Sequence, residues 1–112
     1  MSDCLFCKII KKEIPSNMVY EDQNVFAFRD IHPQAKHHIL VVPKAHIPNL
    51  DDISSNDTYG HVFSAIKKIV KTEGIDKSGY RVIINNGPDA GQTVFHVHFH
   101  IIGGERISDK MA

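Results

Sequence analysis

Three histidines that alternate with apolar residues near the end of the 112-residue chain constrain its fold most strongly. Residues 96–102 read His-Val-His-Phe-His-Ile-Ile, and apolar–polar alternation with a period of two is typical of a β-strand. We therefore predict a strand from Val94 to Ile102. His96, His98 and His100 are expected on one of its faces, and the apolar residues between them are expected in the core.

The rest of the chain predicts one long helix, one short helix and further strands. Apolar residues recur with helical spacing between Asp57 and Glu73, and Gly74 stands where a glycine often ends a helix. The short helix is expected over residues 5–12. Strands are expected at residues 19–21, 24–29, 39–42 and 80–84. This order predicts an α+β fold, an antiparallel sheet covered on one side by the long helix.

Composition and charge narrow the possible partners. Thirteen basic residues balance thirteen acidic ones, which argues against a protein that binds nucleic acid through a basic surface. No apolar run approaches the roughly 20 residues that span a bilayer, and residues 1–12 do not resemble a signal peptide. We expect a single domain over residues 1–112, a cytoplasmic location, and no nucleic acid or membrane partner.

The histidine row favours proton transfer over a catalytic metal. Neighbours on one face of a strand are roughly 6–7 Å apart, so three such histidines can hardly converge on one ion. A histidine such as His98 can instead attack phosphorus if its second nitrogen is held by an acceptor, while flanking histidines transfer protons. The turn-rich loop before the strand offers backbone N–H groups and the side chains of Gln92 and Thr93 to phosphoryl oxygens.

These residues resemble the signature of the histidine triad (HIT) family, in which three histidines alternate with apolar residues. The resemblance also includes residues 91–93, 28–31 and 38–44, and it extends from about Cys4 to Gly104. The chain is most similar to the Hint-like branch, because the third histidine is present and only a short tail follows. That tail, residues 105–112, departs from the branch because it lacks an aromatic residue, which leaves the leaving-group preference open.

The resemblance implies a hydrolase of purine nucleoside 5′-phosphoramidates (AMP-linked amines) that forms a nucleotidyl-histidine intermediate on His98. His96, His100 and His38 would complete the catalytic group, with His38 linked to the proton relay. Asp30 would bind the ribose hydroxyls of the purine nucleoside monophosphate. The base pocket would comprise Leu5, Phe6, Ile9, Phe28 and Ile31, and the phosphate and leaving group would contact Asn85, Gly91, Gln92 and Thr93. A dinucleoside polyphosphate hydrolase and a non-catalytic nucleotide-binding module are the alternatives.

The resemblance also bears on assembly and metal content. It implies an HIT-like antiparallel sheet with few helices, joined into one continuous sheet across a homodimer. Cys4 and Cys7 have the spacing of half a zinc site, and a disulfide between them is disfavoured in a reducing compartment. His46 and His96 would supply the remaining ligands of a structural zinc ion, and no catalytic metal would be required.

Overall fold

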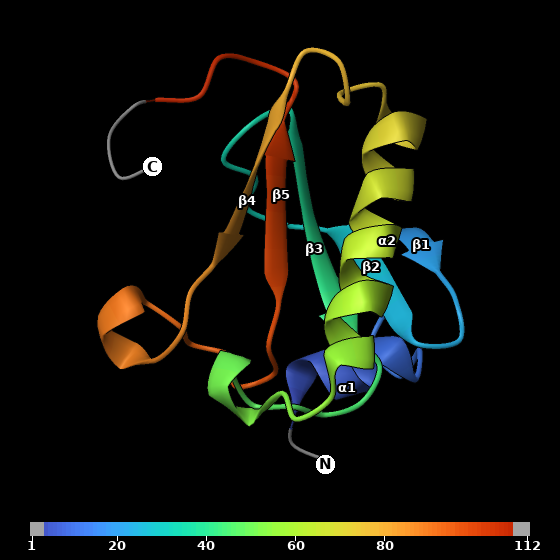
Figure 1. Ribbon diagram of the computed structural model, residues 1–112, viewed down its shortest axis with the longest axis vertical. Helices are drawn as coiled ribbons and strands as arrows, with labels where there is room; N and C mark the ends of the chain where they lie inside the picture. Colours follow the sequence, from blue (N-terminus) through green and yellow to red (C-terminus); the bar gives the residue numbers. More distant parts are fainter. Residues whose placement is uncertain (1–3, 109–112) are drawn as a thin grey trace.

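The computed structural model describes residues 4–108, in which five strands form one antiparallel sheet of order β1-β2-β3-β5-β4 (Figure 1). Two α-helices pack against the sheet, and two 3-10 turns, Leu50–Asp52 and Pro88–Ala90, lie in the loops. The helices are α1 (Leu5–Ile10) and α2 (Asn56–Glu73), and the strands are β1 (Met18–Glu21), β2 (Val25–Arg29), β3 (His37–Pro43), β4 (Tyr80–Ile84) and β5 (Phe99–Gly103). The α+β prediction is confirmed.

Helix α2 begins and ends where the sequence predicts. The Ser55 side chain accepts a hydrogen bond from the Asp57 backbone N–H, which caps the first turn. Gly74 ends the helix with a φ of 75°, a left-handed conformation that costs glycine little. The apolar face of α2 packs along the sheet (Figure 1), and its buried residues are Val62, Ala65, Ile66, Ile69 and Val70. This face closes the larger hydrophobic core.

Strand alternation divides the sheet into two faces with separate cores. The odd-numbered residues of the central strands pack with α2; they include Val25, Ala27, Ile39, Val41, Phe99 and Ile101. The even-numbered residues pack with α1; they include Phe26, Phe28, Leu40 and Val42, together with Phe6 and Ile9 of the helix. Residues that adjoin one another in a strand therefore serve opposite faces, and this separation places the site residues on the α1 face.

The final strand is shorter than predicted. Strand β5 begins at Phe99, and residues 94–98 lie outside the ladder. The reason is that both neighbouring strands pair with β5 only as far as Phe99, which lies opposite Val41 and Ile84. In the residues before Phe99 the backbone forms hydrogen bonds outside the ladder; for example, Val97 N–H donates to the carbonyl of Ile47 (2.7 Å). The predicted alternation nevertheless continues, because Val97 lies in the same core as Phe99.

No helix within the described part of the chain is long and apolar enough to cross a membrane.

Candidate active site

A pocket of about 450 Å³ opens on the α1 face of the sheet and contains two of the three predicted histidines. Helix α1 supplies one apolar wall, and the even-numbered residues of β2 and β3 supply another. His98 and His100 lie in this pocket together with Asp30, which directly follows β2. The apolar lining includes Leu5, Phe6, Ile9, Phe28, Ile31 and Leu40. An apolar pocket with a few converging polar groups is the usual form of a small-molecule site.

His98 is held in the orientation of a nucleophile. Its Nδ1 lies 2.8 Å from the backbone carbonyl oxygen of His96, so Nδ1 carries the proton and donates it to that oxygen. The lone pair is therefore on Nε2. The Phe6 ring meets the His98 ring edge to face at 5.1 Å, and the side chain is buried. Burial lowers the pKa of His98, although the Asp30 charge opposes this effect, so the imidazole is neutral at pH 7.

A chain of hydrogen bonds fixes the protons of the other two site histidines. The backbone N–H of Gln34 donates to Nδ1 of His38 (3.0 Å), so the proton of neutral His38 must be on Nε2. The Nε2–H of His38 faces Nδ1 of His100, with 2.9 Å between the nitrogens, which makes His100 Nδ1 the acceptor. The proton of His100 is therefore on Nε2. This atom is buried without a hydrogen-bond partner in residues 4–108, so it is available to a bound substrate.

Both members of this pair are neutral at pH 7. Burial lowers the pKa of His38, with the Asp30 charge acting in the opposite direction. Burial and the neighbouring His98 and His38 rings lower the pKa of His100 to about 4. A neutral His98 with a free Nε2 lone pair thus lies beside a neutral hydrogen-bonded histidine pair, an arrangement that could support nucleophilic attack and proton transfer.

The group formed by Asp30, His38 and His100 has the spacing of a metal site, but its protons do not suit one. The three candidate ligand atoms lie within 4.8 Å of one another. A metal on His38 Nε2 would require the proton on Nδ1, where it would oppose the N–H of Gln34. The Gln34 N–H keeps the His38 proton on Nε2, so that nitrogen has no lone pair for a metal. The same N–H thereby sets the direction of the hydrogen bond from His38 to His100. We therefore interpret this group as proton-transfer machinery.

A second cluster, Cys4, Cys7, His46 and His96, has the donor atoms and spacing of a metal site, and its His96 has the tautomer that such a site needs. His96 Nε2 donates to the carbonyl oxygen of Pro43 (2.8 Å), which leaves the Nδ1 lone pair facing the two sulfur atoms at 3.4 and 3.6 Å. His46 Nδ1 lies 3.3 Å from Cys7 Sγ. A tetrahedral zinc ion would separate nitrogen and sulfur ligands by about 3.6 Å. All four ligand atoms lie within 4.8 Å of one another, so the donor set could hold zinc.

Neither cysteine of this cluster forms a disulfide. Both are free, and burial together with the neighbouring Cys4 raises the pKa of the Cys7 thiol. An ion that binds thiolates would reverse this effect and release the protons. Cys4 precedes α1 and Cys7 lies within its first turn, so the cluster joins the start of the helix to the loop segment that carries His96.

The structure separates the predicted catalytic residues into two groups. His98 and His100 line the pocket and His38 contacts His100, whereas the polar atoms of His96 contact the cysteines and Pro43. Only the backbone of His96 reaches the pocket group, through its carbonyl oxygen. The three histidines therefore do not form one continuous relay of side chains. The His96 side chain contacts the two sulfur atoms, and the Phe6 ring packs against both His96 and His98.

Most of the predicted nucleotide contacts line the pocket, but the Gln92 side chain does not. Asn85, Gly91 and Thr93 are lining residues. The Gln92 side chain is buried and fully engaged within the loop: its oxygen accepts from Gly87 N–H, and its amide group donates to the carbonyl oxygens of Pro48 and Val94. It orders the loop rather than pointing into the pocket.

Sequence reasoning missed part of the lining. Leu40 lies two residues after His38 on the same strand face, so the period of two could have identified it. His32 and residues 14–17 also line the pocket, and they come from loops whose path no local pattern indicates. The backbone N–H of His32 donates to the Asp30 carboxylate, which orients the acid at the pocket edge.

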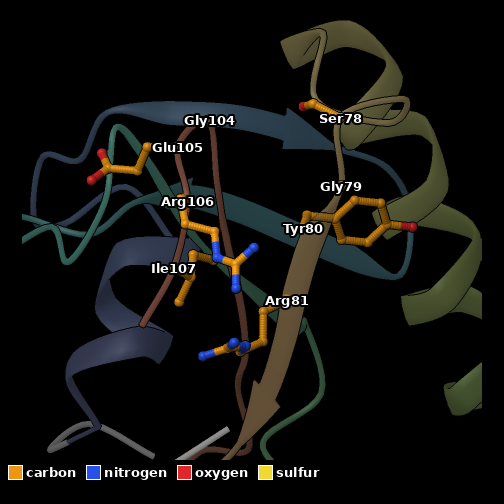
Figure 2. A pocket seen from close by; sticks show the side chains of 8 residues that line it. All are labelled: Ser78, Gly79, Tyr80, Arg81, Gly104, Glu105, Arg106 and Ile107. Atoms are coloured by element: carbon orange, nitrogen blue, oxygen red, sulfur yellow. The ribbon is translucent and has the colours of Figure 1, made fainter. Parts of the chain in front are cut away.

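Another cavity, of about 490 Å³, lies at the start of β4 and the segment after β5 (Figure 2). Its lining includes Arg81 and Arg106, and the figure shows the Glu105 carboxylate directed away from both guanidinium groups. That carboxylate accepts a hydrogen bond from the Lys36 backbone N–H. None of the lining residues is a histidine or a cysteine, so the candidate chemistry lies in the histidine pocket.

Comparisons with known proteins agree with this geometry. Residues 11–107 match the family described as HIT domain. The chain is 43% identical over 112 residues to the purine nucleoside phosphoramidase of Escherichia coli (strain K12), covering 98% of this chain and 94% of the relative. It is 45% identical over 111 residues to the 14 kDa zinc-binding protein of Zea mays, covering 96% and 86%. A histidine triad protein structure from Clostridium difficile superposes with a TM-score of 0.94 at 49% identity, covering 97% and 96%.

Proposed function

The chain belongs to the HIT domain family, and from this membership we propose that it hydrolyses purine nucleoside 5′-phosphoramidates to a nucleoside monophosphate and an amine. The observation that carries the proposal is the pairing of a free Nε2 lone pair on His98 with an unpartnered Nε2–H on His100 in one pocket. A nucleophile and a proton donor are the two groups that cleavage of a P–N bond needs.

In the first step of the proposed reaction, His98 Nε2 bonds to phosphorus as the P–N bond breaks. The leaving nitrogen takes the proton of His100 Nε2, His100 Nδ1 accepts the proton of His38 Nε2, and a proton from solvent replaces it on His38 by way of the Asp30 carboxylate, 3.4 Å from His38 Nε2. The pair therefore stays neutral, and the positive charge is on the nucleotidylated His98, whose Nδ1–H remains bonded to the His96 carbonyl.

In the second step water attacks phosphorus and the bond to His98 breaks. His100 Nε2 takes a proton from the water, its Nδ1 proton passes back to His38, and His38 returns one proton to solvent through Asp30. The relay thus takes one proton from solvent in the first step and returns it in the second, so the overall reaction consumes only substrate and water. Both imidazoles must be neutral at the outset, which agrees with their lowered pKa values.

We place the nucleoside along the pocket by its chemistry. The purine base would lie between the apolar side chains of α1 and β2, namely Leu5, Phe6, Ile9 and Phe28, with Ile31 at the rim. Asp30 would accept hydrogen bonds from the ribose hydroxyls. The phosphate would then face His98, with Asn85, Gly91 and Thr93 around it.

Initial rates on two substrate classes test the proposal against its alternatives. Adenosine 5′-phosphoramidate and a diadenosine polyphosphate would be compared at equal concentrations, with AMP release followed. We expect the phosphoramidate to be hydrolysed faster. Faster hydrolysis of the dinucleotide would favour a polyphosphate hydrolase, and AMP binding without turnover of either would favour a non-catalytic binding module.

We further propose that the Cys4, Cys7, His46 and His96 cluster holds a structural zinc ion. Its four donors have the spacing of a zinc site, His96 presents the Nδ1 lone pair to both sulfur atoms, and the Zea mays relative is named a zinc-binding protein. The ion would fix the start of α1 and supply no step of the reaction. A reducing compartment such as the cytoplasm suits the two free thiols that bind it.

The edge of the sheet supports the proposed homodimer. Within the described residues β4 pairs only with β5, so its outer edge presents unpaired backbone groups. Val82, Ile83 and Ile84 of this strand are only partly buried. Pairing of two β4 strands would join two sheets into one. Light scattering after gel filtration should then give twice the chain mass, and a single chain mass at micromolar concentration would contradict the proposal.

A further inference from the structure

Glu73, the last residue of α2, contacts two residues that each adjoin a site residue in the sequence. Its Oε1 accepts hydrogen bonds from Arg29 (2.8 Å) and from His37 Nδ1 (2.8 Å), and its Oε2 accepts a second bond from Arg29 (3.0 Å). Arg29 precedes Asp30, and His37 precedes His38. One carboxylate on the far face of the sheet thus holds both positions from which the relay side chains project.

Strand alternation explains this arrangement. The side chains of odd-numbered Arg29 and His37 reach Glu73 of α2, although Arg29 also lines the edge of the pocket. Asp30 lines the pocket, and the His38 side chain contacts His100. The backbone joins the two positions as well, because Asp30 N–H donates to the carbonyl oxygen of His38 (2.9 Å). Movement of either strand end would therefore change the 3.4 Å separation between the Asp30 carboxylate and His38 Nε2.

The Glu73 carboxylate is mostly buried, although its partner Arg29 is 37% exposed. The Glu73 side chain is only 10% exposed, against 25% for Glu21, a carboxylate of β1 that pairs with Lys12 and Lys44. Burial opposes the charge of Glu73, but the bonds from Arg29 and His37 outweigh it and lower its pKa. Both Arg29 bonds come from Nη2, so the carboxylate is fixed by this one nitrogen together with His37 Nδ1, and such charge-assisted bonds are stronger than neutral ones.

We propose that Glu73 is a positioning residue for the Asp30–His38–His100 relay and acts through Arg29 and His37. This inference deepens the proposed function and rests on it for its kinetic readout. Glu73→Gln would place an amide N–H₂ group against the Arg29 guanidinium that now donates to Oε2, so the ion pair would be lost. The relay would then be misplaced although no residue of the pocket had changed.

The test compares Glu73→Gln with Glu21→Gln, the matched carboxylate whose basic partners adjoin no relay histidine. We expect Glu73→Gln to lower kcat for adenosine 5′-phosphoramidate by roughly 10-fold or more, because small displacements of reacting groups cost large factors. The effect on KM should be smaller, and Glu21→Gln should leave kcat within about twofold of the wild type, as expected for a solvated pair. Unchanged kcat in folded Glu73→Gln would overturn the proposal.

Imidazole ¹⁵N NMR supplies a readout that needs no turnover, so it separates failure of this inference from failure of the proposed activity. His38 should be a single Nε2–H tautomer in the wild type and in Glu21→Gln, and a mixture in Glu73→Gln. A double-mutant cycle with Arg29→Met should be non-additive, and additive losses would show that Glu73 does not act through Arg29. Glu73→Asp, which keeps the charge but is too short to hold both partners, replaces Glu73→Gln if the latter does not fold.

Discussion

His38 Nε2 lies 2.9 Å from Nδ1 of His100, and the N–H of Gln34 on the other side of the His38 ring determines the direction of the hydrogen bond between them. Because a backbone N–H cannot accept, the donor order runs from Gln34 through His38 to His100 and ends at a buried N–H of this pocket-lining residue. The proposed chemistry depends on this order, and the following predictions test the groups that maintain it.

The acid limb of the pH profile of kcat/KM should lie below pH 6.5, the ordinary pKa of histidine. Burial lowers the pKa of His98 and lowers that of His100 to about 4, so both stay neutral to lower pH than an ordinary histidine does. The Asp30 charge raises both pKa values, and its removal in Asp30→Asn should move the limb to still lower pH while KM rises. Asp76→Asn, an exposed control, should leave the profile unchanged, and a limb that moves to higher pH in Asp30→Asn would contradict the account.

Substitution by alanine should change the free energy of unfolding in opposite directions at two glycines. Gly104 has a φ of 88°, and a Cβ there would lie 2.4 Å from Cδ2 of His37, so Gly104→Ala should lower the free energy of unfolding by about 2 kcal/mol. Gly60 lies within α2, and a Cβ there would enter open space, so Gly60→Ala should raise it by up to about 1 kcal/mol. Urea denaturation measures both changes, and equal effects at the two positions would contradict this reading of Gly104.

Removal of the proposed zinc ion should weaken nucleotide binding through α1. The helix has only six residues, too few to be stable alone, and its Phe6 and Ile9 form the pocket wall between the cluster and His98. A strong chelator should therefore lower the Tm and raise the Kd for AMP in the wild type. Cys7→Ser, already unable to hold the ion, should not respond to the chelator, and metal analysis should give one zinc per wild-type chain. An AMP affinity that is unaffected by metal loss would refute the coupling.

Gln92 should matter for stability more than for phosphate contact. Its buried amide makes three hydrogen bonds that fold the loop back on Pro48 and Gly87, and Gln92→Ala would leave those groups unpaired. The free energy of unfolding should fall by about 1–3 kcal/mol. Thr93→Val, at an exposed neighbour that lines the pocket, should change stability by less than about 0.5 kcal/mol. Equal stability losses in the two variants would show that the loop does not depend on Gln92.

The helix and strand predictions succeeded where the signal was local. Helix α2 carries its own cap, apolar stripe and terminal glycine, and the alternation around His98 identified the correct faces. The strand start at Val94 was wrong because strand length depends on how far the neighbouring strands extend, and local alternation contains no information about that. The pattern persisted beyond the ladder because Val97 still packs in the core.

Prediction of the candidate site also succeeded where the signal was local and failed where it depended on distant contacts. Periodicity grouped the three histidines, but it could not show that His96 turns to the cysteines of α1, because that contact joins residues 92 positions apart. The Gln34 N–H that orients His38 is a backbone group and leaves no signal in the sequence. Glu73 was likewise invisible, since its role follows from contacts across the sheet with Arg29 and His37.

Acid-quenched mass spectrometry tests the central claim, a covalent nucleotide on His98, most directly. The enzyme would be mixed with excess adenosine 5′-phosphoramidate and quenched within its first turnovers, with His98→Ala treated in parallel. We expect an AMP adduct on the peptide that contains His98 in the wild type, and neither adduct nor AMP release in the variant, which should still bind AMP. Turnover by His98→Ala at the wild-type rate, or an adduct on another residue, would contradict the account.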